Sequence, residues 1–441
     1  MEFCKEFGGK ALTARETDAT LQSDSGEPTG FGPGTRGPGS RGHLSKLSWG
    51  IFCFTCFQLA FLQPYWVLFP GERANLFSGL LCLLSLIAAI LVAREREVRA
   101  EPLEIIICAL LAALTVVSGL LSSSAFSSSI RGFVLLSSGL GGFWCARILL
   151  STGRAQEFFT WFCLAILAGI IVVSLLGYAL AGDVKALLDT NPHPLADRMI
   201  LLSFAPLVLL LRRDYWAKLI GGAVMAAGYV VFYLSNLRSA MLIPVAMAGI
   251  GLWFRALRLR HFLALLVIAA IAMVYFFAKL PAWKLGKDHE PAYYRAENYL
   301  FSWRIAQQNP IFGIGLRTQR EAYLDGYGIT YPYVTKERFA ASVRTIVTSE
   351  NIFLTLMVGL GIPFLILYSV GLITLMARLF KVAKTGIPES FLPPLALVLP
   401  ITGSLLHNFV FDGLLYPQLC WYFHILLGLI PLRHKADAQA L

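Results

Sequence analysis

Five ionisable residues stand at the ends of apolar segments in this chain. Arg198 and Arg238 begin two predicted helices, and Glu350 lies in the first turn of a third. His407 ends a fourth, and Asp412 follows it. Two guanidinium groups could bind a phosphate or pyrophosphate through planar, bidentate hydrogen bonds. A carboxylate or an imidazole could then accept the proton of an incoming hydroxyl group.

The composition places these residues in a membrane protein. Of the 441 residues, 57% are hydrophobic and 14% are charged, whereas a soluble domain carries about 25% charged residues. Cys53 and Cys56 form a C-x-x-C pair without a second pair of ligands. Because a structural zinc ion takes four ligands, we predict no metal site and no cofactor.

Apolar runs recur along the chain at the length of a transmembrane helix, for which about 20 residues are needed. The predicted spans are 47–69, 74–93, 103–121, 130–150, 158–181, 198–211, 216–234, 238–254, 261–278, 346–377, 392–408 and 415–432. The predicted fold is therefore an all-α polytopic membrane protein with about twelve transmembrane helices.

The loops between the spans indicate the orientation. With the N-terminus in the cytoplasm, every inner loop is rich in Lys and Arg, as the positive-inside rule requires. The predicted organisation is a disordered cytoplasmic tail (1–46), helices 1–9 (47–278), an outer loop domain (279–345), helices 10–12 (346–432) and a cytoplasmic tail (433–441). Both termini are thus expected in the cytoplasm.

The loop 279–345 is the long hydrophilic connection, with ten Lys or Arg and six Asp or Glu. In this topology it lies on the outer face, at the same depth as the five ionisable residues. That convergence predicts an anion-binding pocket under a cationic loop, and the surrounding lipid indicates that the bound phosphate belongs to a lipid.

Structural roles compete with these functional ones. Arg198 could extend to the headgroups, and Glu350 could favour a helix dipole. His407 could bond a neighbouring helix, and Asp412 could cap a turn. We interpret His193, which stands between two prolines, as part of a loop.

Three motifs resemble those of the O-antigen ligase and polymerase family. Residues 302–316 carry Trp, Ala, Pro and then a Gly-x-Gly pair in the family's order. Residues 349–361 resemble the following motif, although Glu350 stands where the family usually has histidine. Residues 235–240 resemble its Ser-Arg-small turn. The resemblance covers about 190–365 well and the rest only as a hydropathy pattern.

The resemblance implies a metal-independent, inverting glycosyltransferase in the bacterial inner membrane, with its active site in the periplasm. Such an enzyme moves a glycan from undecaprenyl pyrophosphate to an acceptor, which is lipid A-core for a ligase and another lipid-linked repeat for a polymerase. By this resemblance Arg238 binds pyrophosphate, with Arg198 a second ligand. Glu350 and His407 are the predicted catalytic residues. The accessory candidates are Asp412, Arg317 and Asn351.

A transporter of a lipid-linked or anionic solute is the alternative from another class. Transporters place ionisable groups near the middle of the membrane and are built from repeated halves. The chain shows no obvious internal repeat, and its ionisable residues gather at one end of the helices. The sequence therefore favours the glycosyltransferase, and no nucleic-acid partner is expected.

Overall fold

The computed structural model describes residues 38–61, 72–93, 101–122, 125–184, 186–188, 192–212, 214–235, 238–254, 290–316, 349–385 and 392–431, with short pieces between 259 and 271. Residues 1–41 form a unit of their own, of which only 38–41 are described. The fold below is that of residues 42–441. All of its described secondary structure is helical, which agrees with the predicted all-α class.

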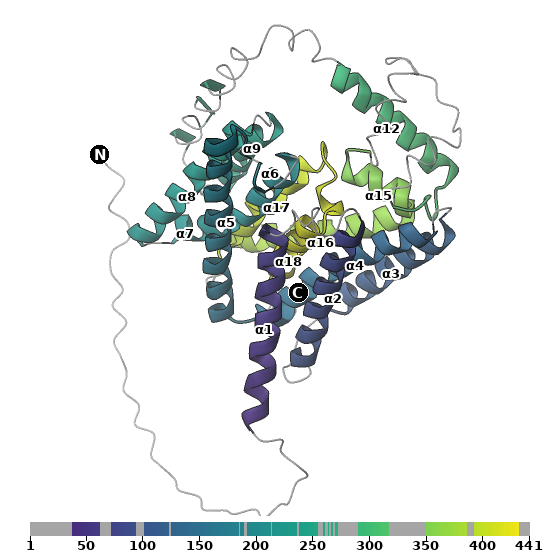
Figure 1. The fold of residues 1–441 in the computed structure, drawn as a ribbon, viewed down its shortest axis with the longest axis horizontal. Helices are drawn as coiled ribbons and strands as arrows, with labels where there is room; N and C mark the ends of the chain where they lie inside the picture. The colour runs from purple at the N-terminus through teal and green to yellow at the C-terminus, as the bar shows by residue number, and fades with distance from the viewer. Residues whose placement is uncertain are drawn as a thin grey trace, which may run out of the picture. The chain divides into compact units, whose positions relative to one another are not determined.

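Figure 1 shows the helices of the described ranges packed side by side. In chain order they are α1 (Pro38–Phe61), α2 (Glu72–Ala93), α3 (Pro102–Leu121), α4 (Ala125–Leu149), α5 (Gly153–Ala181), α6 (Pro192–Leu202), α7 (Phe204–Leu211), α8 (Tyr215–Leu234), α9 (Arg238–Trp253), α12 (Glu290–Gln308), α15 (Ile352–Leu360), α16 (Ile362–Thr385), α17 (Pro394–His407), the 3₁₀ turn η2 (Gly413–Leu415) and α18 (Pro417–Gly428).

Eight helices in the described ranges are long and apolar enough to cross a membrane. They are Leu44–Phe61, Asn75–Ala93, Pro102–Leu121, Ala125–Leu149, Gly153–Ala181, Pro192–Leu211 (α6 and α7 taken together as one span), Tyr215–Leu234 and Ile362–Lys384. Shorter apolar helices cover Ile243–Trp253 and Pro394–His407. The predicted count of twelve stays a prediction, because the span 261–278 and much of the loop 279–345 lie outside the described residues. The helix α1 begins at Pro38, earlier than predicted.

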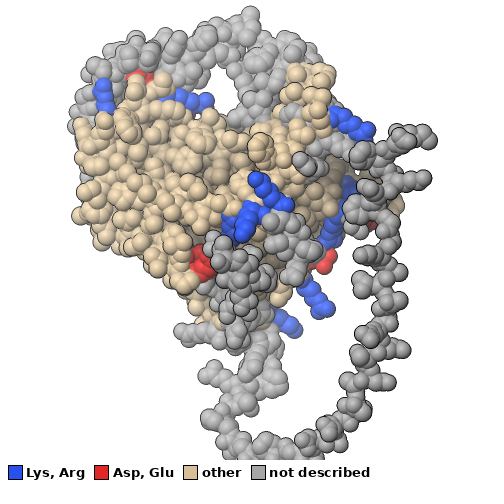
Figure 2. All heavy atoms as spheres, turned by 180° about the vertical axis from the view of Figure 1, so that it is seen from behind, with Lys and Arg blue, Asp and Glu red and all other residues tan. Residues whose placement is uncertain are grey.

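Apolar packing explains which helices are central. The helix α4 packs along α2, α3 and α18, and more than half of its residues are buried. The Tyr422 hydroxyl of α18 donates to the carbonyl of Cys56 on α1, at 2.6 Å. On α3 and α16, by contrast, many large apolar side chains are exposed, as a face toward lipid requires. In Figure 2 the described surface carries few charged residues, which stand in small groups on a largely uncharged face.

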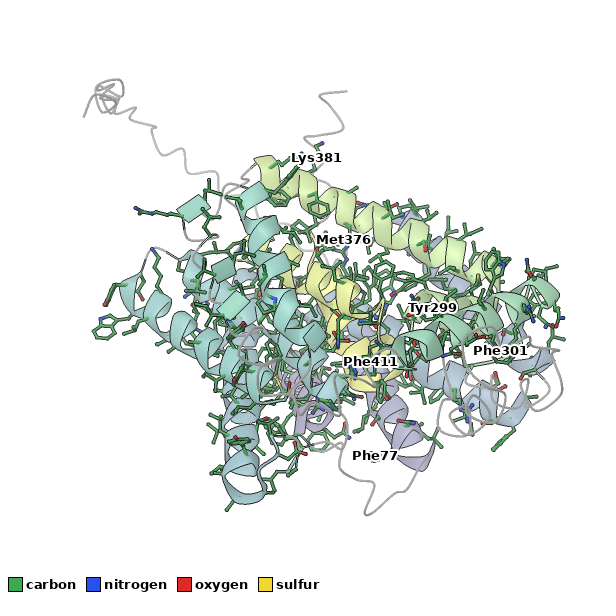
Figure 3. The ribbon with its side chains drawn as sticks, turned by 90° about the horizontal axis from the view of Figure 1, so that it is seen from above. Phe77, Tyr299, Phe301, Met376, Lys381 and Phe411 are labelled. Carbon is green, nitrogen blue, oxygen red and sulfur yellow. The ribbon has the colours of Figure 1, made fainter. Side chains whose placement is uncertain are left out.

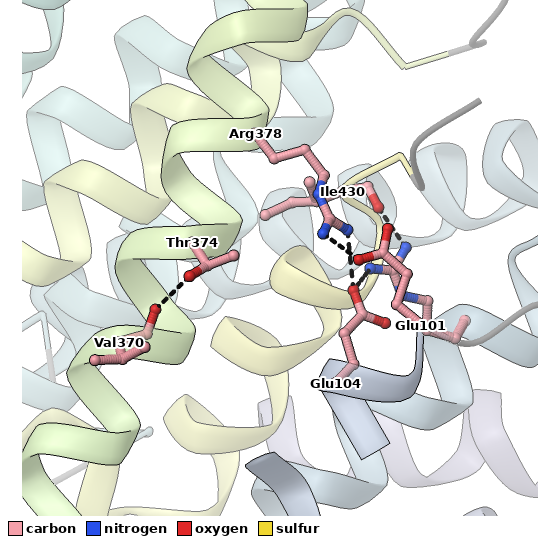
Figure 4. A network of polar contacts seen from close by, with 7 residues as sticks. Glu101, Glu104, Val370, Thr374, Arg378 and Ile430 are labelled. Carbon is pink, nitrogen blue, oxygen red and sulfur yellow. Dashed lines mark hydrogen bonds and ion pairs between the residues drawn. The ribbon is translucent and has the colours of Figure 1, made fainter. Parts of the chain in front are cut away.

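A buried ion network joins three helices at one end of this bundle (Figure 4). The Glu104 carboxylate on α3 accepts from Arg147 on α4 at 2.8 Å and from Arg378 on α16 at 3.1 Å. Arg378 also pairs with Glu101 at 2.5 Å, and Arg147 donates to the carbonyl of Ile430. Because the side chains of Glu104, Arg147 and Arg378 are at most 9% exposed, each charge depends on its partners.

Two predicted spans are each divided into two helices. Pro206 interrupts the predicted sixth span, because it lacks an N–H and its ring disfavours the preceding helical turn; α6 ends at Leu202 and α7 begins at Phe204. Gly361 interrupts the predicted tenth span, where its φ of 88° lies in the left-handed region. The helix α15 ends before Gly361, and α16 begins after it.

The break at Gly361 is closed by residues 309–316, which we call the glycine loop. Ile314 N–H donates to the carbonyl of Val358 at 2.9 Å, and Gly315 N–H donates to that of Gly359 at 3.0 Å. Unpaired backbone groups in an apolar interior cost several kcal/mol each. The glycine loop therefore supplies the partners that the broken helix lacks, as a short strand would.

Two serine side chains at the C-terminal end of α3, Ser118 and the C-cap residue Ser122, also hold the glycine loop. Ser118 Oγ lies 2.6 Å from the carbonyl oxygen of Phe312 and 2.8 Å from that of Gly359, and its single proton is shared between these two acceptors. Ser122 Oγ donates to the carbonyl of Ile314 at 2.7 Å. The loop is thus fixed between α3 and α15, and it carries α12, which packs against α15.

We predict that Glu104→Gln destabilises the protein by roughly 3–5 kcal/mol, because it leaves two buried guanidinium groups without their shared carboxylate. Thermal unfolding in detergent, with the folded fraction monitored by size-exclusion chromatography, measures this loss. Glu157→Gln is the control, since Glu157 pairs with Arg212 at 3.3 Å in a partly exposed position and such pairs contribute about 0–1 kcal/mol. Equal losses in the two variants would contradict a structural role for the network.

We predict that Gly361→Ala destabilises the protein more than Gly182→Ala does. Both glycines have positive φ, at 88° and 70°, so alanine is strained at both positions. A Cβ atom at 361 would also lie 2.0 Å from the carbonyl oxygen of Ile311, whereas a Cβ at 182 meets nothing within 4 Å. The difference between the two melting temperatures measures the contact with the glycine loop together with the greater backbone strain at 361, where φ is 88° and ψ is 168°, against 70° and 10° at 182. No difference would refute both.

Candidate functional site

The site is built where α12 meets the start of α15. Arg295, Glu350 and Asp412 lie there, and we call them the carboxylate half. Glu350 Oε2 accepts from Arg295 Nε at 3.0 Å, and both side chains are about one-third exposed. The pair is therefore open to solvent and to a ligand.

Glu350 has an unusual backbone conformation. Its φ of 52° lies in the left-handed region, which a residue with a Cβ atom avoids at a cost of about 1–2 kcal/mol. The Asp412 carboxylate holds this conformation from two sides, because Oδ2 accepts from Glu350 N–H and Oδ1 accepts from Thr355 Oγ, both at 2.9 Å. Strain of this kind, fixed by buried partners, is typical of functional sites.

Asn351 caps the helix that follows. Its side-chain oxygen accepts from Phe353 N–H at 3.0 Å and from Leu354 N–H at 3.2 Å, the usual geometry of an N-cap. Its amide nitrogen donates to the carbonyl of Phe409 at 3.1 Å. The predicted accessory residue thus fixes the start of α15 beside Glu350.

His407 lies at the C-terminus of α17 and belongs to a second cluster. We call His193, Asp197 and His407 the histidine half. His407 Nδ1 lies 3.2 Å from Asp197 Oδ1, and His407 Nε2 lies 3.2 Å from His193 Nδ1. The two imidazole rings stack with centroids 5.3 Å apart, and the ring of Phe411 stacks on that of His193 at 4.9 Å.

One turn of chain joins the two halves, since residues 407–413 contain both His407 and Asp412. Asn408 Nδ2 donates to Asp197 Oδ2 at 3.1 Å. Gly413, directly after Asp412, lies so close to α6 that an added Cβ would be 2.1 Å from Asp197 Oδ2. The two halves are therefore adjacent parts of one site.

An aromatic side chain of α12 borders this turn. Figure 3 labels Tyr299 on α12 and Phe411 in the turn. The Tyr299 hydroxyl donates to the carbonyl of Phe409 at 3.2 Å. Burial raises the pKa of Tyr299 above its usual value, while Arg295 lowers it in part. The phenol therefore stays protonated and keeps this hydrogen bond.

Of the two predicted phosphate ligands, the structure describes the side chain of Arg198 but not that of Arg238. Arg198 is fully buried, and its guanidinium donates to the carbonyl of Ala60 on α1 at 2.5 Å. Arg238 begins α9, but its side chain lies outside the described residues. Arg317 also lies outside them. The structure thus brings Glu350, Asn351, His407 and Asp412 together, and it places the Arg198 side chain against α1.

Sequence reasoning missed three members of the site. His193 was expected in a loop, but it is the second residue of α6, because proline is favoured in the first turn of a helix. Asp197 stands beside Arg198 in the sequence and was overlooked, although an acid in an apolar run is itself a signal. Arg295 lies within the long hydrophilic loop, where sequence alone does not single out one cation.

Among the described residues, no group of three or more His, Cys, Asp or Glu side chains is arranged to hold a metal ion. The described polar side chains of the site form hydrogen-bonded or ion-paired contacts instead.

A family model described as O-antigen ligase matches residues 221–369. This range begins in α8, contains Arg238, Arg295, the glycine loop and Glu350, and ends in α16. No curated protein matches the chain. The match confirms the family resemblance drawn from the motifs. The chain is an integral membrane protein similar over this range to the O-antigen ligases, a family whose members act on glycans in a membrane.

Proposed function

We propose that this protein is a glycosyltransferase that moves a glycan from undecaprenyl pyrophosphate to an acceptor hydroxyl, with inversion at the anomeric carbon. The observation that carries the proposal is the strained Glu350, paired with an open Arg295 inside the range that matches the O-antigen ligase family. The acceptor is lipid A-core if the protein is a ligase, and a second lipid-linked repeat if it is a polymerase.

The cations of the site bind the leaving group in this proposal. When the acceptor oxygen attacks the anomeric carbon, the bond to the pyrophosphate breaks and its electrons stay with the phosphate oxygen. Fixed guanidinium groups stabilise that developing charge. The partly exposed side chain of Arg295 supports its assignment to this role, and Arg238 is the second cation of the proposal. Arg198 stays a predicted second ligand, although its side chain would have to leave the carbonyl of Ala60.

Glu350 and His407 remain the two predicted groups for the acceptor proton. Glu350 lies in the carboxylate half, where it also orients Arg295. His407 lies in the histidine half and is only 1% exposed. The chemistry calls for no cofactor, because the pyrophosphate is already an activated leaving group.

The orientation is part of the proposal. The ion network of Arg147 and Arg378 lies at the ends of α4 and α16, whereas Glu350 precedes α15 and His407 ends α17. The basic inner loops place the ends of α4 and α16 in the cytoplasm. The site, at the start of α15 and the end of α17, then faces the periplasm. Both termini are then cytoplasmic.

We predict that Arg238→Ala and Arg295→Ala each lower transfer by roughly 10²–10³-fold, as the loss of one charge-stabilising donor does. The assay incubates purified protein in nanodiscs with undecaprenyl-pyrophosphate glycan and lipid A-core, and it measures the rate of product formation. Arg154→Ala is the control, because Arg154 is an exposed arginine at the start of α5. No transfer by the wild type to lipid A-core or to a second lipid-linked glycan would refute the proposed function.

We predict that Glu350→Gly lowers transfer by at least about 100-fold while the melting temperature stays the same or rises. Glycine relieves the left-handed strain at this position, but it removes the carboxylate that orients Arg295 and can accept a proton. Transfer and thermal unfolding are measured on the same preparation. A variant that loses stability and activity together would show that Glu350 has only a structural role.

A further inference from the structure

We propose that Asp197, His407 and His193 form a proton relay, in which His193 takes the proton of the acceptor hydroxyl. The relay rests on the proposed function, and it adds His193 as a catalytic residue with Asp197 and His407 behind it.

Because the side chain of His407 is buried, it can accept the proton of the acceptor hydroxyl only through another group. Its side chain is 1% exposed, and both ring nitrogens face protein groups, Asp197 on one side and His193 on the other. No acceptor sugar can reach such an imidazole. His193 is partly exposed at the start of α6, and it is in direct contact with His407 Nε2.

The partners of the rings determine where the protons lie. Asp197 Oδ1 lies 3.2 Å from His407 Nδ1 as an ion-pair contact without hydrogen-bond geometry. The negative charge of Asp197 favours the tautomer of His407 that carries its proton on Nδ1, the nitrogen nearer to it. His407 Nε2 then presents a lone pair, and His193 Nδ1 must carry the proton between the two rings. His193 is thereby in the tautomer whose Nε2 is the basic nitrogen.

The proton transfers balance without another reactant. The acceptor oxygen forms the new glycosidic bond, and its proton goes to His193 Nε2. The proton on His193 Nδ1 moves to His407 Nε2. His407 becomes an imidazolium next to the Asp197 carboxylate. The pyrophosphate leaves with the electrons of the broken bond, and the relay returns its proton to solvent after the products depart.

The surroundings favour a positive charge on His407 over one on His193. His407 lies at the C-terminus of α17, where the helix dipole stabilises a cation, and it faces Asp197. The charged groups on the elements around the pair are Asp197 and Arg198 on α6, Arg295 on α12, Glu350 before α15 and Asp412 before η2.

The test measures transfer by the full-length protein in nanodiscs, with saturating undecaprenyl-pyrophosphate glycan and varied acceptor, across the pH range 5 to 9. We expect His193→Gln and His407→Gln each to lower kcat by roughly 10²–10⁴-fold, the usual contribution of a general base. The double variant should lose no more than either single variant, because residues that act as a unit are not additive. The KM for the donor should stay within about threefold.

The pH profile separates the relay from Glu350. The relay can accept a proton only while both imidazoles are neutral, so the proposal predicts an acidic limb, a fall of wild-type kcat at the acid end of the pH range. Glu350→Gln should keep this acidic limb, whereas His193→Gln should remove it. Added imidazole should restore part of the activity of His193→Ala and none of that of Glu350→Gln.

His424→Gln is the matched control, because His424 is a buried histidine of α18 that contacts the backbone of Cys420. It should keep the wild-type kcat and pH profile. Additive losses in the double variant, a changed KM with unchanged kcat, or an acidic limb that disappears in Glu350→Gln would each overturn the relay while leaving the transferase intact. Absence of transfer in the wild type would overturn both.

Discussion

The site depends on one constraint, which is that backbone carbonyls inside an apolar bundle must have hydrogen-bond partners. The break between α15 and α16 exposes such carbonyls at Val358 and Gly359, and the glycine loop pairs with them. Gly313 and Gly315 have positive φ, and neither position has room for a side chain. A Cβ at 313 would lie 2.4 Å from the carbonyl oxygen of Val358 at this break, and a Cβ at 315 would lie 2.3 Å from Ser122 Oγ. The Gly-x-Gly pair of the family motif therefore allows the backbone of the glycine loop to pair with that of the broken helix.

This pairing has a consequence for the chemistry. The glycine loop follows α12 directly, so the loop's position against α15 also positions Arg295 against Glu350. Asp412 then joins the start of α15 to the turn after α17, and His407 precedes that turn. A chain of contacts thus runs from the helix break to the histidine half. A substitution at the break would act on catalysis through geometry rather than through charge.

Part of this architecture could be predicted from the sequence, and part could not. The long apolar runs predicted most helices, because a lipid-facing helix must be apolar along its whole length. The divisions at Pro206 and Gly361 lie inside apolar runs, so hydropathy does not reveal them. The grouping of Glu350, His407 and Asp412 followed from topology, since each ends or begins a helix at the same face.

The pairing of individual side chains could not be predicted from the sequence. His193 lies between two prolines, a pattern equally typical of a loop, and only the stacking on His407 reveals its contact. Arg295 is one of several cations in the hydrophilic loop. Which of them pairs with Glu350 depends on the register of α12 against α15. The burial of Arg198 likewise depends on which face of α6 meets α1.

A structure of the protein with a bound polyprenyl pyrophosphate would test the account most directly. The account predicts that diphosphate oxygens lie within hydrogen-bond distance of Arg295, with the anomeric carbon between Glu350 and His193. A diphosphate bound at the opposite end, beside Arg147 and Arg378, or anywhere remote from α12, would contradict it.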